Sequence, residues 1–535
     1  MDTGWDAIPP VSIAIMIGQQ PEVGSRWRTV LDRGIANAMT AIPNQVLASS
    51  SNVFVDTRAA LQALDPTTVT NAYLTEVGRE GQWIVRSGTA PVSDPAQGVY
   101  VISSTAGYYW QRIFDGLAVN SGWFGGDWQA AIDFAGAASI PTVNASGTIT
   151  LTAGTGSLKM RPGVTVYNFA GTATVMQANG ANINHIVDFT AYAANGARLI
   201  GIVVDGNWAN NTKTIGNSNS LALIYDQNDI TIQNCTLRNG TGNGVIIRAG
   251  LRYNIDNNVI DSVFIQGITA VSNNPNFQVR GVISRNKISN HGQIAIVVGY
   301  STFVKVRDNI VQSSLVRTGL NVTKAAGSNV VTSNSGPFFT PDMAGRFIVI
   351  GGGTEYLITA VTSTTTLTVN LTTGSFSIQP AAIGQGDNIS LQGCNYCDVE
   401  DNYSFSGATL GISVFCDATY GGYGVRVSRN TCVNNGSAGL SIQVASGSNS
   451  QLDTIFSDNL VVDPGQSNTA GAAVANVGLY VQGAALIDGI VADSNRFRSF
   501  TGFMAYGISY GAGATNKVTG NNLYRGYTTA PVNNP

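Results

Sequence analysis

Four residues near the middle of the chain combine side chains that transfer protons with a recurring position in the sequence. Asp261 and His291 each fall in a turn just before a short apolar run, and Asp226 and Asp229 follow another such run. Carboxyl and imidazole groups are common general acids and bases, because their surroundings can bring their pKa close to the working pH. We therefore treat these four residues as candidate catalytic residues.

The four candidates divide into a pair and a separate carboxyl group. If Asp261 and His291 share a turn level in adjacent repeats, the carboxylate would hold the imidazole in one tautomer or favour its charged form. That pair would position a water molecule or a hydroxyl group, while Asp226 or Asp229 would transfer the proton. The alternative reading of Asp261 and His291 is structural: a solvated turn aspartate and a hydrogen-bonded turn histidine.

A second group of residues places tyrosines near aspartates. Flat apolar rings beside hydrogen-bond acceptors suit sugar rings, which carry apolar faces and hydroxyl groups. The candidate substrate-binding residues are Tyr225, Tyr300, Asp417, Tyr420 and Tyr423. Hydrolysis of a glycosidic bond would also need two carboxyl groups, about 5–5.5 Å apart for retention or roughly 6.5–9.5 Å apart for inversion. The sequence does not single out one such pair.

The cysteines do not form a recognisable metal or redox site. The chain has five cysteines, at positions 235, 394, 397, 416 and 432, mostly within apolar strand-like runs. Cys394-x-x-Cys397 has the spacing of half a zinc site, but the second half is missing and no helix follows. The sequence therefore predicts buried free thiols, with no metal and no cofactor.

The candidates lie within a repeat marked by an asparagine between apolar residues. The pattern apolar-x-x-Asn-x-apolar has its asparagine at 258, 286, 309, 430, 459, 495 and 521, with looser copies at 234 and 402. Successive asparagines are 24, 28 and 23 residues apart from 234 to 309, and 28, 29, 36 and 26 apart from 402 to 521. Each copy is followed by a small residue and a short run rich in Val and Ile, which predicts strands broken by turns.

Units of this length cannot bury an apolar face alone, so neighbouring units must stack. Over about residues 190–528 the chain resembles the right-handed parallel β-helix of the pectate-lyase-like superfamily. We therefore predict an all-β solenoid, in which the repeated asparagine turns the chain and hydrogen-bonds to the coils on either side. Leucine-rich repeats are the competing architecture, but no recurring L-x-x-L-x-L phrase is present.

The gap from Asn309 to Asn402 points to an insertion. It is 93 residues long, and removing the 65 residues from 321 to 385 leaves 28, the ordinary spacing. The removed segment is expected to form about five alternating strands and is similar to a small β-module of phage tail proteins. It is either a passive insertion on a turn or a contact surface for a sugar or a neighbouring subunit.

Three further segments resemble bacteriophage tailspikes and tail fibres. Residues 78–116 are similar to a segment that precedes the β-helix in those proteins, and 201–208 (GIVVDGNW) to their early coils. Residues 123–138 are similar to the helix that caps their first coil, with Asp127 as its N-cap, although the usual preceding acidic run is absent. The first of these segments lies within a separate N-terminal head, which also includes a predicted helix over 26–42.

The predicted organisation follows from these boundaries. A virion-attachment head at 1–120 precedes the capping helix and first coils at 121–190. The solenoid then runs over 191–320 and continues over 386–535, with the inserted β-module at 321–385 between the two parts.

The resemblance implies a phage tailspike or tail fibre that recognises a host cell-surface polysaccharide and depolymerises it by glycoside hydrolysis. It also implies a homotrimer, contacts with other tail proteins through the head, and a place in the virion tail after synthesis in the host cytoplasm. The alternative is a non-catalytic receptor-binding or structural tail fibre, which shares the same architecture.

Two other enzyme classes are less favoured. A lyase would need a base and a group that neutralises a uronate, but cations are scarce on the candidate turns apart from Arg248 and Arg317. A free pectinase-like enzyme is disfavoured by the head, by an N-terminus without an export signal, and by the missing Asn-Thr-Asp and Asp-Asp motifs.

Composition excludes two kinds of partner. The net charge of −3 and the charged content of 11% provide no basic surface for nucleic acid. The apolar run near the N-terminus has only seven residues, which is too short to insert across a membrane.

Overall fold

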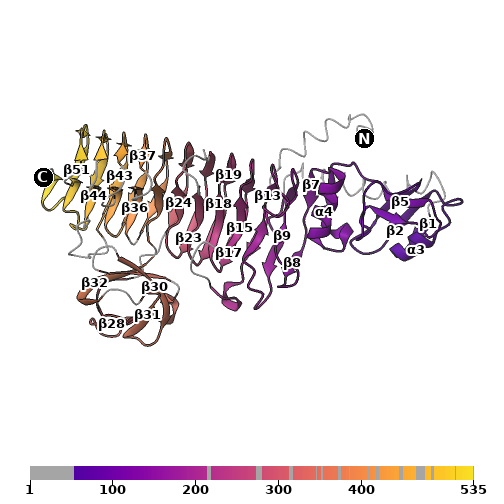
Figure 1. The fold of residues 1–535 in the computed structure, drawn as a ribbon, viewed down its shortest axis with the longest axis horizontal. Coiled ribbons are helices and arrows are strands. Elements are labelled where there is room, and N and C mark those ends of the chain that lie inside the picture. Colours follow the sequence, from indigo (N-terminus) through magenta and orange to yellow (C-terminus); the bar gives the residue numbers. More distant parts are fainter. Residues whose placement is uncertain are drawn as a thin grey trace, which may run out of the picture. The chain divides into compact units, whose positions relative to one another are not determined.

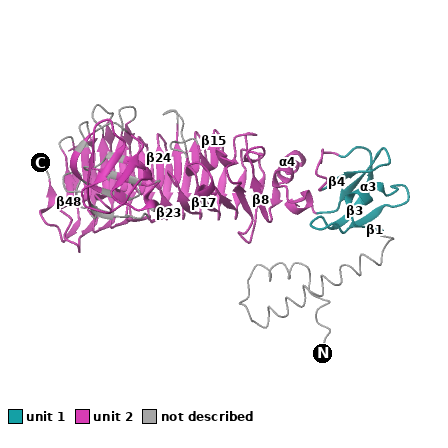
Figure 2. Cartoon of the chain, turned by 90° about the horizontal axis from the view of Figure 1, so that it is seen from below, with its two compact units in different colours: residues 1–90, 99–114 teal, residues 91–98, 115–535 magenta. Residues whose placement is uncertain are grey.

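The computed structural model describes residues 53–533 apart from short internal segments. The segments left out are 214–218, 273–279, 313–316, 345, 351–353, 372–374, 385, 408, 417–420, 445–449, 466–475, 484–486 and 512–513. The predicted helix over 26–42, together with Asp417 and Tyr420, lies outside the described residues. The chain divides into two compact units, one with residues up to 90 and 99–114, the other with 91–98 and 115–535 (Figure 2).

The larger unit is a parallel β-helix, in which each complete coil adds one strand to each of three long sheets (Figure 1). Sheet 1 consists of β6 (Ala118–Asn120), β7 (Thr142–Asn144), β10 (Thr165–Tyr167), β13 (Arg198–Ile200), β16 (Thr231–Gln233), β19 (Tyr253–Asp256), β22 (Gly281–Ser284), β25 (Val304–Arg307), β34 (Asp398–Glu400), β38 (Arg426–Ser428), β42 (Ile455–Ser457), β46 (Val491–Asp493) and β50 (Val518–Thr519).

Sheet 2 consists of β8 (Thr148–Leu151), β11 (Thr174–Gln177), β14 (Val203–Asp205), β17 (Thr236–Gly240), β20 (Val259–Val263), β23 (Lys287–His291), β26 (Ile310–Gln312), β35 (Tyr403–Phe405), β39 (Thr431–Val433), β43 (Leu460–Val462), β47 (Arg496–Arg498) and β51 (Leu523–Arg525). Sheet 3 consists of β9 (Leu158–Lys159), β12 (His185–Asp188), β15 (Ser220–Tyr225), β18 (Asn243–Arg248), β21 (Ile268–Val271), β24 (Ile296–Gly299), β33 (Ile389–Gln392), β36 (Leu410–Cys416), β40 (Ala438–Val444), β44 (Val477–Gly483), β48 (Tyr506–Tyr510) and β52 (Ala530–Asn533).

A fourth, short sheet follows sheet 3 in the later coils. It contains β37 (Gly422–Tyr423), β41 (Gln451–Leu452), β45 (Ile487–Asp488) and β49 (Ala514–Thr515). In all four sheets equivalent residues of successive coils pair in parallel register; Ile255, for example, pairs with Ile232 and Ile283. Most inward residues of these strands are buried apolar side chains, chiefly Val, Ile and Leu, and they stack from coil to coil to form the core.

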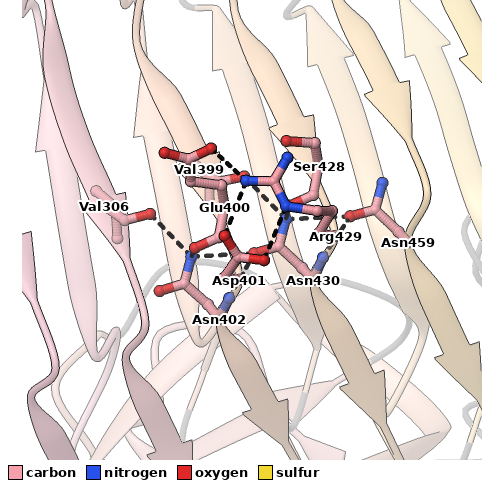
Figure 3. Close-up of polar contacts among 9 residues, drawn as sticks. All are labelled: Val306, Val399, Glu400, Asp401, Asn402, Ser428, Arg429, Asn430 and Asn459. Atoms are coloured by element: carbon pink, nitrogen blue, oxygen red, sulfur yellow. Dashed lines mark hydrogen bonds and ion pairs between the residues drawn. The ribbon is translucent and has the colours of Figure 1, made fainter.

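The repeated asparagines form a ladder at the corner between sheets 1 and 2 (Figure 3). The Asn430 backbone N–H and side-chain amide both donate to Oδ1 of Asn459, at 2.9 and 3.0 Å. Oδ1 of Asn430 accepts the same two bonds from Asn402, at 3.0 Å each, and its amide donates to the Val399 carbonyl oxygen at 2.9 Å. Asn430 is fully buried. The predicted role of the asparagine in linking coils is confirmed.

Two assignments within this ladder were wrong. The Asn495 amide donates to Asn522, at 2.9 Å, and not to Asn521, because the chain reaches the corner one residue later in the last coil. At the N-terminal end of the ladder, the Cys235 N–H donates to Asn258 at 2.9 Å. Cys235 therefore occupies the ladder position that was assigned to Asn234. Asn234 lies one residue earlier with a φ of 55°, a left-handed conformation that asparagine tolerates.

The small residue before each apolar run is explained by a close approach of sheets 2 and 3. A Cβ atom on Gly478 would lie 2.2 Å from Cδ1 of Phe497, and one on Gly439 would lie 2.3 Å from Cγ1 of Val461. Both neighbouring side chains come from sheet 2 and fill the corner where sheet 3 begins. Glycine at this position therefore leaves room for a large core residue.

A helix closes the first coil. Helix α4 (Trp128–Ala138) follows the turn η1 (Ser121–Phe124), and the Asp127 side chain accepts the Ala130 N–H at 3.0 Å as its N-cap. The helix lies against β6, β7 and β9 and buries Ile132, Phe134 and Ala135. The predicted cap is confirmed.

The insertion is a closed six-stranded barrel, whereas about five strands were expected. It contains β27 (Arg317–Lys324), β28 (Val330–Ser333), η3 (Pro341–Met343), β29 (Phe347–Ile350), β30 (Thr354–Val361), β31 (Thr366–Val369) and β32 (Phe376–Gly384). Its first strand begins four residues before position 321. The barrel has its own apolar core, which includes Phe339, Ile348 and Leu367.

The smaller unit contains an open five-stranded sheet in the order β1-β2-β3-β5-β4. Its elements are β1 (Val53–Val55), α3 (Arg58–Ala63), β2 (Asn71–Leu74), β3 (Gly81–Ser87), β4 (Tyr100–Ile102) and β5 (Tyr108–Arg112). Trp83 and Trp110 are fully buried in its core. Among the described helices of the chain, none is long and apolar enough to cross a membrane.

Candidate functional site

The outer face of sheet 3 carries a column of side chains with one member per coil. The parallel register aligns Tyr225, Arg248, Val271, Gly299, Gln392, Phe415, Gln443 and Gln482. Neighbouring strands lie about 4.8 Å apart, so the sheet holds these groups at a regular spacing along the solenoid. The column contains the exposed ring of Tyr225, the partly buried ring of Phe415 and three glutamine amides, and Arg248, Val271 and Gly299 lie between Tyr225 and the first glutamine.

A second column on the same face lies closer to the strand starts and is made of small side chains. Its members are Thr269, Val297, Ser390, Ser413 and Ser441. The glutamines of the first column lean over it, since Nε2 of Gln392 lies 3.5 Å from the Ser390 hydroxyl and Nε2 of Gln443 lies 3.4 Å from that of Ser441. These contacts orient the amides.

Asp387 brings a carboxyl group to this face at the point where the chain leaves the barrel. Its side chain accepts the Leu410 N–H at 3.1 Å, the Ser413 hydroxyl at 3.0 Å and the Thr409 hydroxyl. Burial raises the pKa of Asp387 above its ordinary value, although these hydrogen bonds act against the shift. Since its side chain is only half-buried, it remains within reach of a ligand.

Sequence reasoning missed Asp387, although its signal was present. The residue stands just before the apolar strand β33, which is the pre-strand position from which Asp261 and His291 were selected. That strand was not recognised as one of the repeated apolar runs, because Asn388 and not a small residue precedes it.

A cavity of about 310 Å³ lies between the solenoid and the barrel. Its polar and aromatic lining residues are Trp208, Lys213, Ser262, Asn290, His291 and Arg346, and the others are Val263, Gly292, Pro341 and Ala344. Trp208 begins the short turn η2 (Trp208–Asn210), and its ring packs near Phe264, Ile265 and Leu357. Leu357 belongs to β30, so this apolar contact joins the barrel to the solenoid.

The structure brings Asp261 and His291 to this corner, but with different surroundings. His291 ends β23, whereas Asp261 was expected in a turn but lies in the middle of β20, where it pairs with Ser289 of β23. The Asp261 carboxylate accepts hydrogen bonds from Ser262 and Asn290 at 2.8 Å each and from Ser289 at 2.6 Å. It therefore orients two side chains of the cavity wall.

His291 is buried, with 1% of its surface exposed. Burial lowers the pKa of His291 to about 3, so its imidazole is neutral at physiological pH. A general acid or base works best with a pKa near the operating pH. This environment argues against the predicted proton-handling role and favours a structural one.

Asp226 and Asp229 are not brought near Asp261. They lie on the turn that follows β15, a strand of six residues, whereas Asp261 lies in β20, the sheet 2 strand that leads into the turn before sheet 3. At about 3.3 Å per residue the strand separates the two turns by roughly 16 Å. Asp229 also forms an exposed ion pair with Arg252 at 2.7 Å, and the hydrogen bond from Arg252 lowers the pKa of Asp229. The expected cooperation across sheet 3 is therefore not supported.

Two of the three described candidate tyrosines lie at or just after the end of a sheet 3 strand, and the third, Tyr423, ends β37 of the fourth sheet. Tyr225 ends β15 and is 45% exposed, while Tyr300 occupies the turn after β24 with a φ of 50°. Tyr423 packs edge-on against Tyr396, with ring centroids 5.2 Å apart, and Tyr396 stacks on Phe303 at 5.4 Å. A hydrogen bond with Asp453 raises the pKa of Tyr423. Phe303 and Tyr396 were missed because they follow no repeated motif.

The cysteines are buried free thiols, as predicted. Burial raises the pKa of Cys394, and its thiol donates to the Val298 carbonyl oxygen at 3.2 Å. Within the described residues, no group of three or more His, Cys, Asp and Glu side chains is placed to hold a metal ion.

Comparisons with known proteins agree with the fold. Residues 163–336 match the family model described as "Right handed beta helix region", which confirms the predicted right-handed parallel β-helix. No curated protein matches the chain in sequence.

Three solved structures are similar at low sequence identity. Full-length tailspike protein 2 of an Escherichia coli O157:H7 bacteriophage is 10% identical with a TM-score of 0.48, and the match covers 84% of this chain and 52% of that one. The catalytic domain of a GH87 alpha-1,3-glucanase is 12% identical with a TM-score of 0.47 and coverages of 81% and 71%. A tailspike of the Acinetobacter baumannii bacteriophage Fri1, described as a capsular polysaccharide depolymerase, is 11% identical with a TM-score of 0.37 and coverages of 90% and 76%. The chain thus spans about half the length of the first of these proteins.

Proposed function

We propose that this protein is a phage tailspike or tail fibre that binds a host cell-surface polysaccharide along the outer face of sheet 3. The observation that carries the proposal is the column from Tyr225 to Gln482, which holds two aromatic rings and three glutamine amides in one aligned row on a rigid sheet. Aromatic rings contact the apolar faces of sugars, and amides exchange hydrogen bonds with their hydroxyl groups. A polymer needs such a regular series of contacts.

The proposal includes the setting of this activity. We propose that the protein is a homotrimer in the virion tail and that it is made in the host cytoplasm. The smaller unit would join it to other tail proteins. These features rest on the resemblance of 78–138 to phage spike proteins.

Depolymerisation by glycoside hydrolysis is the second part of the proposal, and Asp387 favours it. A carboxyl group with a raised pKa stays protonated closer to neutral pH and can donate a proton to a leaving oxygen. Asp387 stands on the polysaccharide-binding face and is held by two hydroxyl groups and one backbone N–H. We assign it as the candidate general acid, in place of Asp226 and Asp229.

The experiment compares Asp387→Asn with Asp226→Asn in the full chain. Capsular polysaccharide and lipopolysaccharide from candidate hosts are the substrates, and both binding and released reducing ends are measured. We expect Asp387→Asn to lower cleavage by about a hundredfold while binding persists, since general acids contribute that much. Asp226→Asn should cleave like the parent, because asparagine tolerates the φ of 55° at this turn.

Each result separates the alternatives. If the parent protein binds polysaccharide but releases no reducing ends, it is a non-catalytic receptor-binding or structural fibre. Loss of cleavage in Asp226→Asn with full activity in Asp387→Asn would reverse the assignment of the acid. Thermal unfolding measures whether both variants keep the melting temperature of the parent, which would show that their fold is intact.

A further inference from the structure

The cavity between the solenoid and the barrel has an unusual charge distribution. Lys213 and Arg346 come from different parts of the chain, Lys213 from the loop after β14 of the solenoid and Arg346 from the residue just before β29 of the barrel. Among the described residues that line the cavity, none is acidic. Asp261 on sheet 2 is not a lining residue, and its carboxylate accepts hydrogen bonds from the lining residues Ser262 and Asn290 and from Ser289.

Lys213 is held in a position that suits an anionic ligand. Its ammonium group lies 4.4 Å from the Trp208 ring centroid and 5.7 Å from that of Phe264, so two aromatic rings fix it against the wall. Burial lowers the pKa of Lys213, and no carboxylate of the described residues offsets that burial. A ligand carboxylate or phosphate would supply the missing counter-charge.

Two other residues of the cavity wall, Ser262 and Asn290, suit hydroxyl groups. Ser262 and Asn290 each donate a hydrogen bond to Asp261. The Ser262 hydroxyl oxygen and the Asn290 side-chain carbonyl oxygen can therefore still accept hydrogen bonds. His291 is neutral over the physiological range and adds no charge that varies with pH. The cavity volume of about 310 Å³ falls at the lower end of small-molecule sites, which are roughly 300–1,000 Å³.

We propose that this cavity is a binding subsite for an acidic sugar unit, in which Lys213 and Arg346 receive the anionic group while Ser262 and Asn290 accept hydrogen bonds from its hydroxyls. The inference deepens the proposed function, on which it rests, by naming the substrate class: a host polysaccharide that contains an anionic sugar. It also gives the barrel a role, because the barrel supplies Arg346.

Monosaccharides test the subsite directly. Binding of sodium D-glucuronate, sodium D-galacturonate, glucose 1-phosphate, D-glucose and D-galactose to the full chain is measured by titration calorimetry and saturation-transfer NMR. We expect the anionic sugars to bind at least tenfold more tightly than the neutral ones. Comparing the two uronates with glucose 1-phosphate shows whether the site prefers a carboxylate or a phosphate group. A preference for either one supports the inference.

Lys213→Gln should weaken binding of the anionic sugars at least tenfold, and Lys213→Arg should restore most of it. Lys305→Gln is the matched control, because Lys305 is an exposed lysine on sheet 1 of the same solenoid. Unchanged uronate and sugar phosphate binding in Lys213→Gln, or equal binding of acidic and neutral sugars by the parent, would overturn the inference.

The outcomes keep this inference apart from the proposed function. If the parent binds host polysaccharide but no anionic monosaccharide, the subsite is refuted and the proposed function stands. If it binds the anionic monosaccharides through Lys213 but no surface polysaccharide from any candidate host, the subsite stands and the proposed function fails.

Discussion

Asn430 illustrates how a single buried side chain can hold three coils together. Its amide and carbonyl groups bond to Asn402 on one side and Asn459 on the other, and its amide also reaches the Val399 carbonyl oxygen. Every polar atom of the side chain is therefore paired inside the core. Removing the side chain would leave several buried groups without partners, each at a cost of about 1–3 kcal/mol.

We predict that Asn430→Ala lowers the free energy of unfolding by about 3 kcal/mol or more, since the bonds to both neighbouring coils are lost. Asn521→Ala is the matched control: the same atoms are removed, but Asn521 is exposed and lies beside the ladder. Guanidinium unfolding followed by circular dichroism measures both variants. Equal midpoints for the two variants would show that the ladder bonds contribute little.

At the scale of elements, the barrel is separable from the coils that carry it. It has its own core, and sheets 1, 2 and 3 continue across it through the pairs β25 with β34, β26 with β35 and β24 with β33. The Asn309 N–H still donates to Asn402 at 3.0 Å, although 93 residues separate them. The solenoid therefore does not need the barrel for its own hydrogen bonds.

We predict that replacing residues 317–384 with a short Gly/Ser linker leaves a folded β-helix that unfolds cooperatively, with a slightly lower midpoint. The decrease arises because Phe264 and Ile265 lose their contact with Leu357. Circular dichroism and thermal unfolding provide the measurement. A deletion variant without β-type circular dichroism would mean that the barrel is required for folding of the coils.

At the scale of the whole molecule, sheet 2 presents an exposed apolar stripe. Val259, Lys287, Ile310 and Tyr403 are register partners on successive coils, and Val259, Ile310 and Tyr403 are 42%, 47% and 42% exposed. Apolar side chains in a row on a flat sheet favour association with another surface. Closed threefold symmetry would bring the same stripe of three chains together.

We predict that light scattering at micromolar concentration gives three times the chain mass, as the resemblance to phage spikes implies. Ile310→Lys should reduce this mass, because it replaces an apolar contact and would bury a second positive charge next to Lys287, its register partner. Ile378→Lys makes the same change at a residue of the barrel that is 63% exposed, and should leave the trimer intact. A monomer mass for the parent would contradict the trimer.

Much of the fold was determined by the sequence itself. In a solenoid each residue contacts its equivalents in the next coils, so a contact appears in the sequence as a repeat. The asparagine ladder and the glycine that recurs at the start of most sheet 3 strands from β18 onwards were readable for this reason, whereas the helix capped by Asp127 was readable from its local sequence. Asn234 and Asn521 are the exceptions, since each lies one residue before the position that joins the ladder. The length of a turn depends on its backbone conformation, which side-chain type does not specify.

Only the tertiary structure decided which functional groups meet. Trp208, Lys213 and Arg346 share a cavity because Leu357 of the barrel packs on Phe264 and Ile265, a contact between segments that share no repeat. Asp387 acquires its raised pKa from burial among residues of the following coil, and His291 loses its basicity through burial that its neighbours in sequence do not reveal. Asp226 and Asp261 are separated by the length of β15. Such effects depend on packing distance and desolvation, which residue type and spacing do not specify.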